Sequence, residues 1–164
     1  MPRIKISNAL KGFVALADEP MEKVFDRILR SISVPLSRPV EEVIGNCIER
    51  ERRISGCMDT GWVLADLDPA EDFSSELILG LGVSARGIRW RWDVGAPPCG
   101  YLNIPVHFVL VVLAVDGPSR LRTLRASSTI FQADGEPGRS ILGATNLAQA
   151  ISILREFEDA EKIL

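Results

Sequence analysis

The chain has few of the side chains that most often carry out enzyme chemistry. It contains one histidine, His107, and three cysteines, Cys47, Cys57 and Cys99, among 164 residues. The cysteines form no CxxC pair, so the sequence does not support a zinc site of cysteine and histidine. An odd number of thiols without a disulfide pattern is typical of a reducing compartment. We therefore expect a cytoplasmic protein with no metal and no cofactor.

A long apolar run and a phosphate-binding motif are also absent. The longest apolar stretch, residues 106–115, is about half of the roughly 20 residues that a membrane helix needs. The glycines of residues 80–82 and 135–138 form neither GxGxxG nor GxxxxGKS/T. Without such a glycine motif we expect no nucleotide site. The N-terminal residues show no signal-peptide pattern, and together with the short apolar run this leads us to expect no membrane insertion.

The chain lacks the excess of positive charge that is typical of nucleic-acid binding. Its net charge is −3, whereas affinity for nucleic acid comes mainly from neutralised phosphates. Arg86, Arg89 and Arg91 are interleaved with Trp90 and Trp92, a set that could stack on a single strand. The acidic chain favours a strand whose tryptophans are packed and whose arginines face water, so we expect no nucleic-acid partner.

The residues that are present indicate a globular α/β protein. Apolar and charged residues make up 46% and 25% of the chain, and its length corresponds to one domain spanning residues 1–164. Apolar spacing predicts helices over residues 20–34, 39–53 (with Ser37 as N-cap), 119–132 and from Asn146, which caps the last helix. Strands are predicted over residues 63–65, 76–83, 87–94 and 106–113, with a loop over 133–140. Residues 106–113 are apolar on both alternating sets, which predicts a central strand with helices on both faces of the sheet.

Acidic side chains gather directly after one predicted strand. The stretch GWVLADLD begins with glycine and apolar residues and ends in two acids, and Glu71 and Asp72 follow. We interpret it as a short buried strand that delivers Asp66 and Asp68 to a loop. Several carboxylates can bind a hard cation, but the spacing matches no EF-hand, and like-charged acids on a loop are more often hydrated. We expect no metal site here.

The single histidine is the other candidate for chemistry. Any acid–base or nucleophilic scheme that uses imidazole would depend on His107. This residue lies inside the apolar run 106–113, and no GxSxG motif accompanies it. We interpret His107 as a hydrogen-bonded histidine of the core.

Residues 50–66 resemble a family motif. Arg50 and Glu51 form a pair, and Ser55, Gly61 and Leu64 follow. In order and spacing they are similar to the enzyme IIA domains of the bacterial phosphotransferase system (PTS). The fructose, mannitol and nitrogen-regulatory class carries Arg-Glu, then Ser-Thr, then Gly-(Val/Ile)-Ala-(Ile/Leu)-Pro-His. The similarity extends through residues 87–90, 105–110 and 120–131, and it implies a single mixed β-sheet flanked by helices on both faces.

The departures from the family motif concern its reactive histidine. The family's phosphorylated histidine corresponds to Asp66, the proline before it to Ala65, and a second histidine near the family's site to Arg120. The resemblance therefore implies a PTS enzyme IIA-like domain that lacks the phosphoacceptor histidine. Asp66 would place a fixed negative charge at this position, with Arg120 available to pair with it. The binding residues would be Asp66, Asp68 and Arg120.

Three functions are compatible with the resemblance. The favoured one is a regulatory protein, not an enzyme, that contacts a protein partner: a transporter, a kinase or a PTS component, by analogy with the nitrogen-regulatory members. The second is an enzyme that transfers a phosphoryl group through Asp66, with Asp68 or Glu71 helping to hold Mg²⁺. The third is a structural domain without an active site. The partner's identity, a homodimer and the role of residues 91–105, which look longer than the family's turn, are left open.

Overall fold

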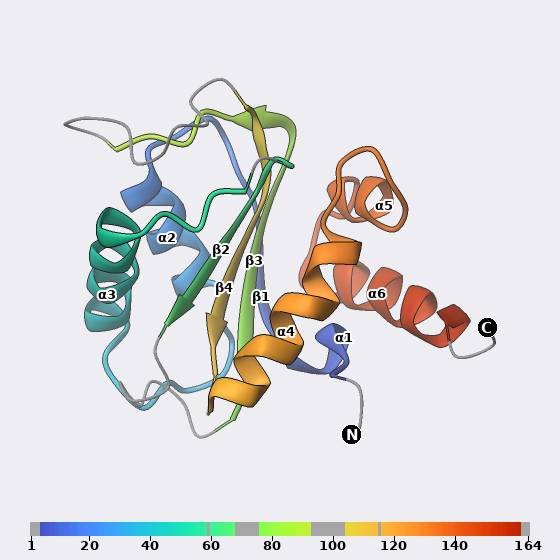
Figure 1. The fold of residues 1–164 in the computed structure, drawn as a ribbon, viewed down its shortest axis with the longest axis horizontal. Coiled ribbons are helices and arrows are strands. Elements are labelled where there is room, and N and C mark those ends of the chain that lie inside the picture. Colours follow the sequence, from blue (N-terminus) through green and yellow to red (C-terminus); the bar gives the residue numbers. More distant parts are fainter. Residues whose placement is uncertain (1–3, 59, 68–75, 93–103, 115, 162–164) are drawn as a thin grey trace.

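In the part of the chain that the structure describes, four strands form one mixed β-sheet (Figure 1). The computed structural model describes residues 4–58, 60–67, 76–92, 104–114 and 116–161. The strands are β1 (Leu10–Ala15), β2 (Trp62–Leu67), β3 (Ile78–Ile88) and β4 (Val106–Leu113), in the sheet order β1-β3-β4-β2. β1 pairs with β3 and β2 with β4 in parallel, whereas β3 and β4 are antiparallel. The predicted mixed sheet is confirmed.

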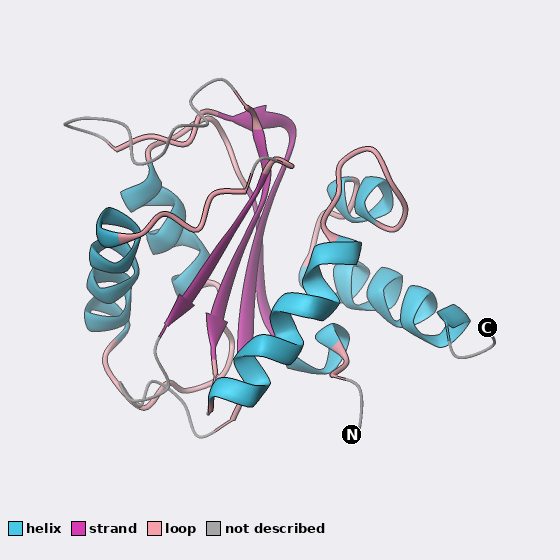
Figure 2. Ribbon diagram, in the orientation of Figure 1, coloured by secondary structure: helices cyan, strands magenta, loops and turns pink. Residues whose placement is uncertain are grey.

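Helices cover both faces of the sheet (Figures 1 and 2). One face carries α2 (Met21–Arg30) and α3 (Val40–Arg53). The other carries α1 (Ile6–Ala9), α4 (Gly117–Ile130), α5 (Gly138–Leu142) and α6 (Leu147–Glu161). This arrangement confirms the predicted α/β fold. Among the described residues, none of the helices combines the length and the apolar composition that crossing a membrane requires.

β4 separates two hydrophobic cores. One set of its alternating side chains packs with α2 and α3, and the other packs with α4, α5 and α6. All six side chains are at most 1% exposed: Val109, Val111 and Leu113 in the first core, Phe108, Leu110 and Val112 in the second. A strand that is buried on both faces is apolar at successive positions. The prediction of a central covered strand is confirmed.

β2 and β3 are longer than predicted. β2 continues past Ala65 because its pairing with β4 extends to Leu67, so the prediction that Asp66 lies in a loop was wrong. β3 includes the predicted strand 76–83 from Ile78 onward and runs on to Ile88. The predicted separate strand 87–94 was wrong: residues 87–88 are the end of β3, residues 89–92 lie beyond it, and residues 93–94 fall outside the described residues. A shift in the pairing register between Val83 and Ile88 disturbs the regular alternation there.

Predictions at two helix ends were also wrong. Pro39, not Ser37, precedes α3, and it makes no side-chain capping bond. Residues 133–140 are not a loop throughout, because α5 begins at Gly138. α1 and β1 are only 4 and 6 residues long, too short to leave a clear periodic pattern in the sequence.

Polar side chains fix the starts of α4 and α6. The Asp116 carboxylate accepts a hydrogen bond of 2.7 Å from the Ser119 N–H, and this bond lowers the pKa of Asp116. The Asn146 Oδ1 accepts one of 2.9 Å from the Gln149 N–H, so the predicted Asn146 cap is confirmed. Such bonds satisfy backbone donors that a helix leaves unpaired in its first turn.

Gly12 lets β1 lie close to the end of α2. A Cβ atom at Gly12 would lie 2.6 Å from Ser31 Oγ and 2.9 Å from the Ile32 backbone nitrogen. We expect Gly12→Ala to lower the free energy of unfolding by about 1–3 kcal/mol, because backbone must move to admit the methyl group. At Gly45, inside α3, a Cβ would meet nothing within 4 Å, and Gly45→Ala should raise that free energy by about 0.5–1 kcal/mol. Urea denaturation measures both changes in the free energy of unfolding. A Gly12→Ala variant as stable as the original chain would contradict the close packing at Gly12.

Candidate functional site

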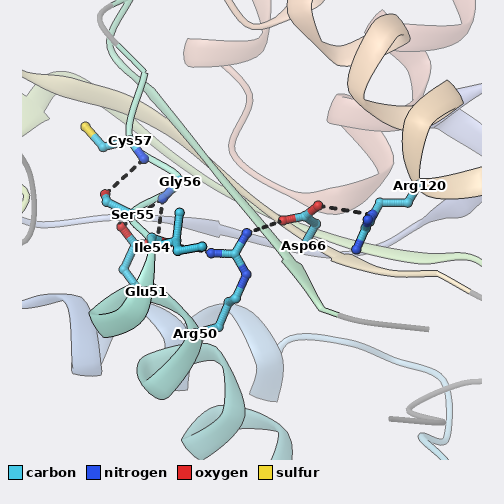
Figure 3. A network of polar contacts seen from close by, with 8 residues as sticks. All are labelled: Arg50, Glu51, Ile54, Ser55, Gly56, Cys57, Asp66 and Arg120. Carbon is cyan, nitrogen blue, oxygen red and sulfur yellow. Dashed lines mark hydrogen bonds and ion pairs between the residues drawn. The ribbon is translucent and has the colours of Figure 1, made fainter. Parts of the chain in front are cut away.

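Asp66 lies near the carboxyl end of β2 between two arginines (Figure 3). Its Oδ1 is 3.2 Å from Arg50 Nη2, and its Oδ2 is 3.4 Å from Arg120 Nε. Arg50 belongs to the last turn of α3, and Arg120 to the first turn of α4. The Asp66 side chain is 18% exposed, against 29% for Arg50 and 37% for Arg120. Each oxygen of a largely covered carboxylate therefore faces its own cation.

The sheet topology explains why these residues meet. β2 and β4 are parallel, and Asp66 pairs with Val112 near the carboxyl ends of both strands. α4 follows β4 after a short connection, which brings Arg120 to the edge of the sheet where Asp66 lies. The chain after α3 turns back and forms a bridge from Cys57 to Val63, so the end of α3 stays beside β2. In α/β folds this edge, at the carboxyl ends of parallel strands, commonly carries the functional site.

A buried glutamate fixes the chain that leaves α3. Glu51 is 2% exposed, and its Oε1 accepts hydrogen bonds from the Ser55 hydroxyl at 2.5 Å and from Trp90 Nε1 at 3.0 Å. Its Oε2 accepts one from the Gly56 N–H at 2.9 Å. A buried carboxylate is tolerated only when donors surround it. Ser55, Gly56 and Trp90 supply those donors and are held in place in return.

Arg50 connects this anchored segment to Asp66. Its Nη1 donates to the Ile54 carbonyl, while its Nη2 donates to Asp66 (Figure 3). The neighbouring Gly56 carbonyl accepts a hydrogen bond from the Leu64 N–H of β2. The guanidinium group is thus oriented by the backbone at the end of α3 and is not a freely rotating surface side chain.

Cys47 is not a nucleophile in this arrangement. It is fully buried in the core under α3. Burial, with a smaller contribution from the charge of Glu51, raises the pKa of the Cys47 thiol to about 12. Since the thiolate is the reactive form, Cys47 is inert near neutral pH.

Two large apolar side chains, each close in the chain to one of the two arginines, face solvent. Among the described residues, the large apolar side chains that are exposed are Ile54 and Leu121, with exposed fractions of 67% and 55%. The Ile54 carbonyl accepts the hydrogen bond from Arg50, and Leu121 follows Arg120 in α4. Ile54 thus lies in the chain just after the Arg50 end of the ion pairs, and Leu121 lies in the chain next to Arg120.

The sequence motif marked part of this cluster. The hypothesis that Asp66 pairs with Arg120 agrees with their 3.4 Å separation. Arg50 was part of the motif, but no role was assigned to it; its position sixteen residues before Asp66 did not signal contact. Asp68, Glu71 and Asp72 lie outside the described residues. In the described ranges no group of three or more His, Cys, Asp and Glu side chains is placed to hold a metal ion.

His107 lies far from Asp66. It is the second residue of β4, whereas Asp66 pairs with Val112. Five residues of strand correspond to about 16 Å at roughly 3.3 Å per residue. The His107 Nδ1 is 2.8 Å from the Ser84 carbonyl oxygen, as expected for a hydrogen-bonded histidine. The structure thus agrees with a structural role for His107.

The segment of alternating Trp and Arg is packed against the fold. Trp90 is 4% exposed, and the guanidinium carbon of Arg52 lies 5.0 Å from the centre of a Trp92 ring. Arg91 Nη1 is 2.8 Å and Arg89 Nε 3.5 Å from the Asp18 carboxylate. The hydrogen bond from the Arg89 N–H, together with the two arginine side chains, lowers the pKa of Asp18. The packed interpretation of this segment is the one that agrees with the structure.

Comparison with known proteins identifies the fold. The sequence matches no family model and no curated protein. The mannitol-specific cryptic phosphotransferase enzyme IIA CmtB of Escherichia coli has a TM-score of 0.60 at 14% identity, covering 93% of this chain and 99% of its own. Nitrogen regulatory protein IIA-Ntr of Neisseria meningitidis has a TM-score of 0.69 at 12% identity, covering 91% and 98%. A Streptococcus mutans protein described as PTS IIA (PtxA) has a TM-score of 0.59 at 10% identity, covering 92% and 88%. The chain therefore has the fold of PTS enzyme IIA proteins, as the sequence resemblance implied.

The anchoring role of Glu51 makes a prediction about stability. We expect Glu51→Ala to lower the free energy of unfolding by more than about 3 kcal/mol, because the donors of Ser55, Gly56 and Trp90 lose their buried acceptor. Glu51→Gln, which keeps one acceptor oxygen, should lose less. Glu49→Ala, at an exposed position of the same helix, should change stability by less than about 0.5 kcal/mol. Urea denaturation followed by tryptophan fluorescence compares the three variants, and equal stability of Glu51→Ala and Glu49→Ala would contradict the anchor.

Proposed function

We propose that this chain is a PTS enzyme IIA-like regulatory domain that lacks the phosphoacceptor histidine and acts by binding a partner protein at the surface around Asp66. The observation that supports this most directly is the Asp66 carboxylate held between Arg50 and Arg120. A histidine relay needs an imidazole that accepts and releases a phosphoryl group reversibly. In this proposal Asp66 stands in the acceptor's position and carries a permanent charge instead.

The surroundings of Asp66 favour a fixed charge over a nucleophile. Both carboxylate oxygens are engaged by guanidinium groups, and these contacts draw on the electron pairs that an attack on phosphorus would use. A carboxylate has two oxygens and one charge, so it imitates a phosphoryl group only in part. The carboxylate nevertheless pairs with both Arg50 and Arg120 without any phosphorylation, which suits a binding surface that needs no donor.

A second candidate is a phosphotransfer enzyme with Asp66 as acceptor. The two arginines are the observation in its favour, because guanidinium groups bind phosphoryl oxygens well and could stabilise an acyl phosphate. An aspartyl phosphate site also needs a cation, and Asp68 and Glu71, the residues suggested to hold Mg²⁺, lie outside the described residues.

Phosphorylation of the purified chain separates the two candidates. The chain is incubated with a histidine phosphocarrier donor system, and its intact mass is recorded with and without Mg²⁺. We expect no gain of mass, while an ordinary enzyme IIA protein in the same mixture gains about 80 Da per phosphoryl group. A gain of that size that disappears in Asp66→Ala would make the chain a phosphoryl carrier and overturn the regulatory proposal.

A further inference from the structure

We infer that the first two turns of α4, residues 117–123, stay on the sheet through the ion pair between Arg120 and Asp66 and detach when that pair is lost. A change at Asp66 is thereby transmitted to the start of a helix. The inference rests on the proposed function for the event that changes Asp66, which is the binding of a partner at the same surface. The coupling itself depends on contacts within this chain, and it is tested without a partner.

The composition of α4 is unfavourable for a helix. Five of its 14 residues are serine or threonine, whose hydroxyls compete with the helical backbone for hydrogen bonds. The helix contains three arginines, Arg120, Arg122 and Arg125, and no acidic residue. Arg120 and Arg122 lie near its amino end, where the helix dipole favours negative charge. The stability of α4 therefore depends on contacts with the rest of the fold.

The buried face of α4 consists mainly of hydroxyl side chains. Ser119, Thr123 and Ser127 are at most 7% exposed. The Thr123 hydroxyl donates to the Ser119 carbonyl at 2.8 Å, and the Ser127 hydroxyl donates to the Thr123 carbonyl at 2.6 Å. These two bonds lie within the helix, so they do not attach it to the sheet. The buried face of α2, by contrast, consists of methionine, valine, phenylalanine, isoleucine and leucine side chains.

The two ends of α4 are attached to the fold differently. The later turns contribute Leu124 and Ile130 to the second hydrophobic core. In residues 117–123 the apolar side chains are Pro118 and Leu121, and both are exposed. Detachment of this segment therefore uncovers little apolar surface, and it costs less free energy than detachment of a turn with an apolar buried face.

The ion pair with Asp66 attaches the start of α4 to β2. Asp66 Oδ2 lies 3.4 Å from Arg120 Nε, and the Asp66 side chain is 18% exposed, so water screens the attraction only in part (Figure 3). Asp66 itself is fixed by its pairing with Val112. The capping bond between Asp116 and Ser119 is local to the start of α4 and cannot replace this attachment. A partner that takes Asp66 or Arg120 for its own ion pair would release the first turns and leave the later turns in place.

Hydrogen exchange of the backbone amides, followed by NMR on the full chain, tests the inference. Asp66→Asn removes the charge of the carboxylate and nearly keeps the size of the side chain. We expect the amides of residues 120–124, in the first turns of α4, to exchange at least about fivefold faster than in the original chain. The amides of β4 report opening of the whole sheet. Equal acceleration in β4 and α4 would show general destabilisation and overturn the inference.

A change on α4 itself supplies a matched control. Arg120→Gln removes the other partner of the ion pair and should accelerate exchange of the same amides. Arg125→Gln removes one positive charge from an exposed position of the same helix and should not accelerate it. If repulsion among the arginines governed α4, both changes would slow the exchange. Circular dichroism verifies that the variants are folded, and equal exchange in Arg120→Gln and Arg125→Gln would overturn the inference.

The double variant Asp66→Asn, Arg120→Gln tests whether the two residues act through one contact. Its α4 amides should exchange about as fast as those of either single variant, because all three variants lack the same ion pair. Accelerations that multiply in the double variant would mean that the two residues act independently, and this would overturn the inference.

Failure of this inference differs from failure of the proposed function. Unchanged exchange of α4 in Asp66→Asn would overturn the coupling and leave the proposed function standing, since the phosphorylation experiment tests that function separately. A phosphoryl group gained at Asp66 would overturn the proposed function, whereas faster exchange of α4 in Asp66→Asn would still support the coupling.

Discussion

The buried carboxylate of Glu51 is the interaction on which the geometry of the site depends. Removing a carboxylate from water is unfavourable unless donors replace the lost hydration. Here the donors come from the chain after α3, through Ser55 and Gly56, and from the chain after β3, through Trp90. One side chain thus joins the end of a helix to two other segments. Arg50 precedes Glu51 by one residue, so the anchor inside the fold determines where the arginine outside it can reach.

Asp66 joins the end of α3 to the start of α4, because it pairs with an arginine from each helix. It is a strand residue, and its pairing with Val112 fixes its height on the sheet. α4 begins just beyond the end of β4, with its start secured by Asp116. Arg50 reaches Asp66 from the last turn of α3, and Arg120 reaches it from the first turn of α4. Without a carboxylate between them, two like charges would face each other across a partly covered space. In the proposed function, an aspartate at position 66 and an arginine at position 120 are therefore coupled, because each balances the charge of the other.

The sequence was sufficient for the features that depend on local pattern. β4 is buried on both faces and is therefore apolar at successive positions. The helices α2, α3 and α6 are buried on one face each, and this burial leaves a periodic apolar pattern in the sequence. Asp66 and Arg120 were paired through the family resemblance, which carries spatial information that periodicity does not. Arg50 belongs to the same motif, but its contact with Asp66 was not predicted. The contact forms because the chain turns back after α3, and no local sequence pattern indicates that turn.

Other features depend on tertiary contacts that no local pattern in the sequence predicts. Glu51 and Trp90 are 39 residues apart in the chain, and a glutamate in a helix with arginines around it is usually a solvent-exposed residue. The tryptophan pattern that suggested a strand over 87–94 instead reflects one indole buried against Glu51 and another beside Arg52. Asp66 was expected in a loop because its charge ended the apolar run, whereas backbone pairing with β4 continues regardless of side-chain polarity.

The same constraints that build the site also hold its exposed residues still. The Ile54 N–H donates to the Arg50 carbonyl, and the Ile54 carbonyl accepts from the Arg50 side chain. Both backbone polar groups of this residue are therefore satisfied while its side chain remains in solvent. Leu121 is held by a helix whose first turn is capped. Binding to groups that are already ordered loses less conformational entropy than binding to a mobile loop. Both exposed apolar side chains are thus attached to backbone that the fold holds in place by hydrogen bonds.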